Sequence, residues 1–341
     1  MAKLKHIFFL LCSLCVTGIA YSQVLHFSQF FNNPLLTNPA NTGFIPDADY
    51  RLGASYRNQY SSIMAVPYKT ISIYGDAQVL RDKLENGWLG LGGVILRDVA
   101  GSGSLTSTKI YGSIAYHQML GNSSLLTAGF NVGWANKRID QTKLKFPDQF
   151  DGKFFDNKIP TSVMLTNNNV SYFDIQAGLN YAYFPTENIY LNAGYSIQHV
   201  NRPVESFIDA SADTTRIAMR HIGFVNAIVK LNDQVIINPN AYFTTQSNSS
   251  ELVVGLNGAY NLSGDGTKQL IGGLYYRLGD AIVPMVGFEL NNVRFTFSYD
   301  VTTSSLHNFN GYRGASEFNV LKKGFYNEYN GNRRATLCPS F

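Results

Sequence analysis

Residues 292–302 alternate between apolar and polar side chains. The odd positions from Val293 to Val301 are apolar and include two Phe and one Tyr, whereas the even positions from Arg294 to Asp300 are polar. Because successive side chains of a strand point to opposite faces, this stretch predicts a strand with one apolar and one polar face. Exposed aromatic rings are unfavourable in water, and an Arg and an Asp are costly in a dry core. Such a strand needs an apolar environment on one side and water on the other.

Strands of this kind recur along most of the chain. The alternation predicts fourteen of them, an even number that is typical of a bacterial outer-membrane barrel. The pattern determines the existence of a strand better than its ends. The predicted strands are residues 50–57, 68–78, 88–96, 110–118, 125–136, 172–183, 189–201, 221–231, 235–245, 251–262, 270–278, 282–290, 293–302 and 316–325.

The connections give a second signal, because long and short links largely alternate. The long links are 58–67, 97–109, 137–171, 202–220 and 303–315, and the short links are 119–124, 184–188, 232–234 and 291–292. An up-and-down outer-membrane barrel has short periplasmic turns and long external loops, whereas a Greek-key sandwich would not produce this alternation except by chance. Two links depart from it: 278–281 is short where a long loop is expected, and 263–268 is the reverse.

Closure of the sheet follows from the surrounding medium. Unpaired backbone N–H and C=O groups are strongly unfavourable in hydrocarbon, so an open sheet edge is not tolerated there. We therefore predict an all-β fold, a transmembrane up-and-down antiparallel β-barrel of about 14 strands within residues 47–325, with apolar faces toward lipid and polar faces toward the lumen. Glycines such as Gly90, Gly92 and Gly93 are expected to let the wall bend.

The composition agrees with a membrane barrel. Charged residues make up 15% of the chain, against about 25% in soluble domains, and a soluble β-sandwich of similar Tyr and Gly content would usually carry more charge. Aromatic residues make up 13%, yet the mean hydropathy is −0.08, as expected when apolar and polar residues alternate. The net charge of +4 is spread along the chain, which argues against a nucleic-acid partner.

The N-terminus predicts export. Residues 1–22 combine Lys3 and Lys5 with a short apolar core and small residues before Gln23, which predicts a cleavable signal peptide and an outer-membrane location in a Gram-negative bacterium; the alternative is a short membrane anchor. After cleavage Cys338 is the remaining cysteine, which excludes an intramolecular disulfide and a Cys-based metal site. Residues 326–341 are expected to form a periplasmic C-terminal tail.

Residues 23–46 do not follow the strand pattern, because Pro and Asn recur among aromatic and aliphatic residues. Two interpretations remain open: a segment packed into the barrel mouth as a plug, which we favour, or a docking peptide for a partner. The residues that would serve either role are Phe27, Phe30, Asn33, Pro34, Leu35, Asn38, Pro39 and Gly43.

Several charged residues alternate with apolar neighbours and should point into the lumen. Two interpretations of these charges remain open: ion pairs that hold a plug inside the lumen, which we favour, or the lining of a polar conduit. These candidate lumen charges are Arg51, Arg57, Arg277, Arg294 and Asp300.

Catalytic and metal sites are weakly indicated. Ser113, His117 and Asp174 can be combined into a triad on paper, but no nucleophile-elbow motif supports it, and we interpret His117, together with His199 and His221, as lumen or interfacial residues. Run 90–93 lacks the Lys-Ser/Thr and the helix of a phosphate loop. Three loop acids have spacing that differs from an EF-hand and are interpreted as solvated: Asp148, Asp151 and Asp156.

A series of short motifs, in order along the whole mature chain, resembles the PorP/SprF family of type IX secretion system outer-membrane proteins. The last motif departs from the family pattern, since Ser340 stands where Arg usually precedes the final Phe. The motifs occupy residues 27–30, 33–35, 38–40, 42–43, 49–51, 56–60, 67–70, 88–92 with Asp98 and 101–105, 115–117, 146–151, 171–174, 201–203, 205–207, 280–287, 297–300, 304–306 and 338–341.

The resemblance implies a non-enzymatic barrel that helps to secrete, localise or anchor a surface protein such as a gliding adhesin. It implies partners in the periplasmic and outer-membrane secretion machinery, besides outer-membrane lipid, and no metal or cofactor. The alternative functions are a passive outer-membrane pore or small-solute channel and, less favoured, a barrel enzyme acting on lipid.

Overall fold

The computed structural model describes residues 27–81, 83–101, 103–144, 146–156, 158–162, 167–207 and 215–326. These residues form fourteen strands, so the predicted number is confirmed. The strands are β1 (Tyr50–Gln59), β2 (Tyr68–Val79), β3 (Gly87–Ala100), β4 (Leu105–Met119), β5 (Ser124–Arg138), β6 (Asn169–Thr186), β7 (Ile189–Gln198), β8 (Arg220–Lys230), β9 (Val235–Gln246), β10 (Ser249–Asn261), β11 (Lys268–Arg277), β12 (Ala281–Leu290), β13 (Val293–Thr302) and β14 (Arg313–Gly324).

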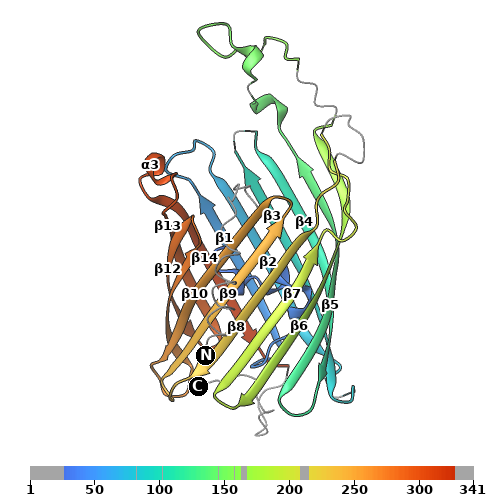
Figure 1. Cartoon of the computed structure of the whole chain (residues 1–341), viewed down its shortest axis with the longest axis vertical. Coiled ribbons are helices and arrows are strands. Elements are labelled where there is room, and N and C mark those ends of the chain that lie inside the picture. The colour runs from blue at the N-terminus through green and yellow to red at the C-terminus, as the bar shows by residue number, and fades with distance from the viewer. Residues whose placement is uncertain are drawn as a thin grey trace, which may run out of the picture.

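Each strand pairs with its neighbour in sequence, and β1 pairs with β14, which closes the sheet into a barrel (Figure 1). The closing pair is antiparallel and continuous from Tyr50 opposite Gly324 to Gln59 opposite Ala315. Closure gives every strand two partners, so that no sheet edge is left in lipid. The predicted up-and-down antiparallel barrel is confirmed.

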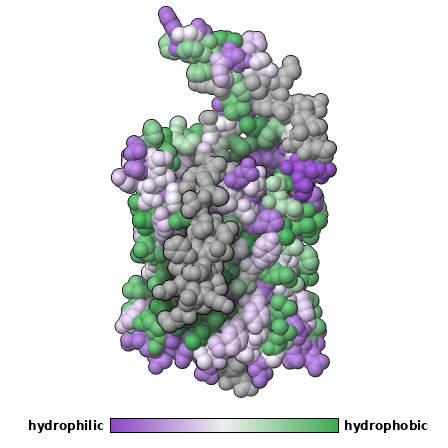
Figure 2. Space-filling model, viewed as in Figure 1, coloured by the Kyte–Doolittle hydropathy of each residue, from purple (hydrophilic) through white to green (hydrophobic). Residues whose placement is uncertain are grey.

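The two faces of the wall differ in polarity as the alternation predicts. In β13, Thr296, Ser298 and Asp300 are buried in the lumen, whereas Phe295 on the other face is 39% exposed. Apolar residues lie along the visible sides of the barrel and polar residues at its lower rim (Figure 2). No helix in the described part of the chain is long and apolar enough to cross a membrane.

One predicted long link is wrong. The hairpin between β3 and β4 is the short turn 101–104, and residues 97–100 and 105–109 belong to the strands. The polar residues Thr106, Ser107, Thr108 and Lys109 hide the alternation because both faces of the strand are polar there. Both faces contact water where a strand extends beyond the hydrocarbon, so polarity does not end the strand.

The other long connections lie at the same end of the barrel, which we call the long-loop end; the opposite end is the short-turn end. The β5–β6 connection extends well beyond the wall at the top of Figure 1 and contains the helical turns η3 (Gln141–Lys143) and η4 (Pro147–Gln149). The β13–β14 connection contains α3 (His307–Asn310).

Residues 27–46, which we call the inner segment, lie within the barrel. They form three short turns: η1 (Phe30–Asn32), α2 (Pro34–Thr37) and η2 (Pro39–Asn41). Pro34 and Pro39 each occupy the first position of a turn, where a missing N–H costs nothing. The predicted signal peptide and residues 327–341 lie outside the described residues.

Candidate functional site

The inner segment is enclosed by the barrel wall. Gln29, Leu35, Asn38, Ala40 and Thr42 are each 0% exposed, although they belong to no strand. The segment begins beside the long-loop ends of β13 and β14, where Ser28 lies. It ends near the short-turn end, where Asp49, three residues beyond the segment, donates its N–H to Gly324 O at 2.9 Å. It therefore crosses most of the length of the lumen.

Four charged side chains gather near the long-loop end. Arg57 contacts Asp300 at 2.7 Å and Glu317 at 3.3 Å, and Arg277 contacts Asp300 at 3.2 Å. All four are buried, and Arg57 is 2% exposed. We call Arg57, Arg277, Asp300 and Glu317 the charge cluster. Removing one member would leave a buried charge uncompensated.

Ser28 joins the inner segment to this cluster. Its Oγ accepts hydrogen bonds from Arg57 Nη1 at 2.7 Å and Arg277 Nη2 at 2.5 Å, and donates to Asp300 Oδ1 at 2.8 Å. The backbone N–H groups of Ser28 and Gln29 donate to Glu317 at 2.8 and 3.1 Å. Because charge-assisted hydrogen bonds are the strong ones, the cluster fixes this end of the segment.

Glycines of the wall make room for residues 38–43. A Cβ on Gly90 would lie 1.9 Å from Thr42 O, and a Cβ on Gly129 would lie 2.5 Å from Pro39 O. A Cβ on Gly178 would lie 1.9 Å from Asn38 Oδ1. We call Gly90, Gly129 and Gly178, on β3, β5 and β6, the glycine seat. Gly90 was expected to let the wall bend; its missing side chain instead admits the backbone of the inner segment.

Gly43 completes this close approach from the other side. Its φ is +66°, and a Cβ there would lie 2.3 Å from Gly90 Cα. Its N–H donates to Asp76 Oδ2 at 2.7 Å, and its carbonyl accepts from Trp88 Nε1 at 3.0 Å. Only a glycine satisfies both the left-handed φ and the backbone contact.

Wall amides and hydroxyls satisfy the backbone of the inner segment. Leu35 O accepts from Asn131, Leu36 O from Gln198 and Thr37 O from Ser196. In return, Asn38 Nδ2 donates to Leu179 O at 2.9 Å and Tyr195 O at 3.3 Å. Further links join Asn33 to Ser55, and Phe30 stacks on Tyr242 with centroids 4.9 Å apart.

Arg51 and Arg294, two of the candidate lumen charges, lie in the lower half of the lumen. Arg51 binds Asp76 at 2.8 Å and donates to Asn41 O at 2.8 Å. The Arg294 side chain is 30% exposed and pairs with Glu289 at 2.6 Å. Lys323 lies between Asp47 and Glu289.

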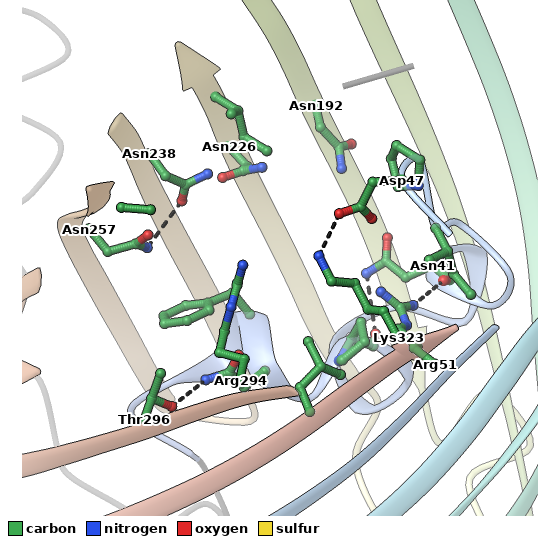
Figure 3. Close-up of a pocket in the computed structure, with 18 of the residues that line it drawn as sticks. Asn41, Asp47, Arg51, Asn192, Asn226, Asn238, Asn257, Arg294, Thr296 and Lys323 are labelled. Atoms are coloured by element: carbon green, nitrogen blue, oxygen red, sulfur yellow. Dashed lines mark hydrogen bonds and ion pairs between the residues drawn. The ribbon is translucent and has the colours of Figure 1, made fainter. Parts of the chain in front are cut away.

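Asp47, Arg51, Arg294 and Lys323 line a cavity of about 330 Å³ near the short-turn end, which we call the lower chamber. Figure 3 shows Asn192, Asn226, Asn238 and Asn257 on four neighbouring strands of one wall, facing Arg294 and Lys323. Asn192 Oδ1 is buried without a hydrogen-bond partner. The chamber is thus lined by amides that the inner segment does not satisfy.

A second cavity of about 720 Å³ lies on the other side of the inner segment, near the long-loop end. Phe27 and Phe30 form part of its lining, together with Lys109, Tyr172 and Arg220. We call it the vestibule. Phe30 and Thr37 of the inner segment line both cavities, so the segment lies between the vestibule and the lower chamber.

The three residues of the hypothetical catalytic triad, Ser113, His117 and Asp174, form hydrogen bonds with other residues and not with one another. His117 Nε2 contacts Thr42 O at 2.8 Å and its Nδ1 contacts Thr127 at 2.9 Å. Ser113 contacts Thr42 and Asn131. Asp174 contacts Tyr111 and His199, and His221 contacts Tyr195 on an exposed surface. The triad is therefore not assembled in this structure.

The acidic loop residues cap local turns. Asp148 accepts from the backbone and hydroxyl of Ser162 and from Thr161, and these hydrogen bonds, the backbone one foremost, lower its pKa. Asp151 accepts from two backbone N–H groups, and Asp156 from one. Among the described residues, no three His, Cys, Asp or Glu side chains gather into a group that could hold a metal ion.

Sequence reasoning missed Ser28, Asp76 and Glu317 as partners of the arginines. Asp76 and Glu317 each lie in a predicted strand on the face opposite the apolar residues, so the alternation contained the signal. The sequence contained no such signal for Ser28, because the role of Ser28 depends on where the inner segment enters the barrel.

Residues 19–321 match the family model described as the type IX secretion system membrane protein PorP/SprF. This chain belongs to the PorP/SprF family. The match covers all fourteen strands except the end of β14 and includes the inner segment. The family is a secretion-system membrane barrel and not a known class of enzyme. The predicted family resemblance is therefore confirmed.

Solved structures share the fold of this PorP/SprF chain. The P. putida toluene transporter TodX is 13% identical, and the alignment covers 91% of this chain and 97% of the TodX chain with a TM-score of 0.50. The monoaromatic hydrocarbon channel CymD is 11% identical, covers 92% and 96%, and also has a TM-score of 0.50. At this identity the likeness shows the barrel fold alone. A search of curated proteins found no match.

Proposed function

We propose that this PorP/SprF chain is a plugged outer-membrane barrel that helps to secrete, localise or anchor a partner surface protein, such as a gliding adhesin, without catalysing a reaction. The observation that carries the proposal is the inner segment, which separates the vestibule from the lower chamber and contacts the wall along its length. A protein that holds a partner needs a rigid body in the membrane and no open path for solutes.

The contacts of the inner segment support a static plug. The charge cluster holds Ser28, and the glycine seat holds residues 38–43. Withdrawal of the segment would leave wall amides such as Asn131 and Gln198 without their carbonyl partners. Unmaking buried hydrogen bonds is expensive, so the closed state is strongly favoured.

The partner would bind at the long-loop end. The vestibule lies there, and residues of the β7–β8 and β9–β10 connections line it. Phe27 and Phe30 of the inner segment line the vestibule, so one segment can close the lumen and offer apolar side chains to a partner. Components of the secretion machinery would meet the short-turn end in the periplasm.

A small-solute channel is the second candidate, favoured by the two cavities on either side of the inner segment. It requires the segment to move, whereas a holder does not. The two functions can therefore be separated by fixing the segment in place.

The experiment is a disulfide lock between the inner segment and the wall. Thr42 and Ser113 share a hydrogen bond between their side chains, so a Thr42→Cys, Ser113→Cys double variant should join them under oxidation. The proposal predicts that the locked protein still displays its surface partner on cells, as each single variant does. Loss of display on oxidation, restored by reductant, would contradict a static plug.

Deletion of residues 23–46 provides the complementary arm. The barrel should still insert, because the strand ladders do not include this segment, and display should be lost. If display survives the deletion, the inner segment is not the dock. Pull-down from intact outer membranes would identify the partner.

A further inference from the structure

Near the long-loop end of β2, β3 and β5, three cations on the outer wall form no ion pair or hydrogen bond with the described part of the chain: Lys69 on β2, Arg97 on β3 and Arg138 on β5. All three are exposed. In contrast, six cations that face the lumen each pair with a carboxylate: Arg51, Arg57, Lys137, Arg277, Arg294 and Lys323. The outer cations therefore have a different role from the inner ones.

The register places these cations together near the long-loop end. Lys69 lies opposite Val99, Val99 opposite Thr106, and Thr106 opposite Arg138, which forms one row across four strands. Adjacent strands are about 4.8 Å apart, so Lys69 and Arg138 stand about 14 Å apart along this row. We call Lys69, Arg97 and Arg138 the outer basic patch.

The next two rows toward the membrane centre change from polar to apolar. Arg97 lies in the row that continues through Thr108 and Asn136 to Ser171. The following row is Ile73, Ile95, Ile110, Trp134 and Phe173, five exposed apolar side chains. Each step between rows is two residues, or about 7 Å. Cations, then hydroxyl and amide groups, then apolar side chains follow one another within about 14 Å.

Acidic side chains do not oppose the patch. The outward positions of β2, β3, β4 and β5, all of which the structure describes, include no Asp or Glu. The carboxylate of Asp98, the neighbour of Arg97, faces the other way and accepts from Thr70 at 2.6 Å. Asp140, two residues after Arg138, pairs with Lys143 at 3.2 Å. The patch therefore has no acidic neighbour on the outer face of these four strands.

We propose that the outer basic patch binds the phosphorylated head group of an outer-leaflet glycolipid. The phosphates would contact Lys69, Arg97 and Arg138, the sugar would face Thr108, Asn136 and Ser171, and the acyl chains would lie along the apolar row. Arg and Lys are suited to phosphate. The apolar row directly below the patch favours a lipid over free phosphate, because phosphate alone would gain nothing from it.

The test is native mass spectrometry of the full mature chain in detergent, titrated with lipid A that carries two phosphates on its disaccharide. A Lys69→Gln, Arg97→Gln, Arg138→Gln variant should bind at least tenfold more weakly than wild type. The matched control is Lys83→Gln, Lys268→Gln, Lys322→Gln, which removes three exposed cations from the short-turn end and should bind as wild type does.

Two further probes test the wild-type protein, so the proposal does not depend on how the variants fold. Dephosphorylated lipid A and phosphatidylethanolamine should each bind at least tenfold more weakly than lipid A. Equal binding of either probe, equal loss in both triple variants, or full competition by millimolar inorganic phosphate would overturn the proposal.

Discussion

The barrel wall contacts the inner segment through different kinds of interaction on its two sides. The arc formed by β13, β14 and β1 to β7 contacts it through buried charges, wall amides and the glycine seat. The arc from β8 to β12 contacts it through ring stacks such as Phe30 on Tyr242 and through Arg277, and leaves the lower chamber open. We call these the anchoring arc and the open arc.

The difference shows what fixes a peptide inside a barrel. Backbone can approach backbone where glycine replaces a side chain, as at Gly90 and Gly43, and each carbonyl then finds a donor. On the open arc, Asn226, Asn238 and Asn257 line the lower chamber and form no hydrogen bond with the inner segment. Substitutions of the anchoring contacts should therefore cost stability, whereas substitution of an open-arc asparagine such as Asn226 should not.

The largest effect is expected at the charge cluster. Arg57→Met leaves Asp300 and Glu317 without their main cationic neighbour, and breaking a buried pair in this way costs about 3–5 kcal/mol. The free energy of unfolding in detergent, from urea titration, measures it. Arg97→Met on the outer face of β3 is the matched control and should change the unfolding free energy by less than about 0.5 kcal/mol. If Arg57→Met and Arg97→Met lowered the unfolding free energy equally, the charge cluster would not stabilise the protein as we infer.

The next effect is expected at the glycine seat. A Cβ at Gly90 meets backbone atoms of Thr42 and Gly43, which cannot rotate away. Gly90→Ala should therefore displace the inner segment and cost about 1–3 kcal/mol, the usual range for overpacking. Gly272→Ala is the control, because nothing lies within 4 Å of its Cβ position. An equal shift of the thermal unfolding temperature in Gly90→Ala and Gly272→Ala would contradict the role of the glycine seat.

A smaller difference separates two asparagines. Asn38→Ala removes the amide that donates to Leu179 O and Tyr195 O, at a cost of about 1 kcal/mol. Asn226→Ala on the open arc removes a side chain that forms no hydrogen bond within the described residues, and should change stability by less than about 0.5 kcal/mol. The same urea titration compares them, and a larger loss for Asn226→Ala would reverse the assignment of the two arcs.

The smallest effect is expected outside both arcs, in the β5–β6 connection. The lowered pKa of Asp148 means that its hydrogen bonds to Ser162 stabilise the β5–β6 connection above the ordinary Asp pKa, and that this stability is lost as the pH falls through the lowered pKa. Limited proteolysis of this connection should therefore accelerate in acid, and Asp148→Asn should be cleaved faster already at neutral pH. Asp156→Asn is the control, and unfolding of the barrel should not change in either variant.

The sequence was sufficient to predict the strands of the barrel but not the contacts that the inner segment makes in the lumen. Alternation in residues 293–302 and its repeats predicted every strand, because the membrane imposes period 2 on each strand independently. The β3–β4 hairpin was misjudged because polar residues on both faces of 105–109 hide the period. The partners of Ser28 and the contact of Gly43 with Gly90 could not be predicted, since they depend on where the inner segment enters the barrel and not on a local pattern.

The central claim is that the inner segment closes the lumen. Planar-bilayer recording of the purified mature chain tests it most directly, with the variant that lacks residues 23–46 recorded beside it. The account predicts no steady open-channel current from the wild-type protein and a steady current from the deletion variant. A steady open-channel current from the wild-type protein would contradict the account.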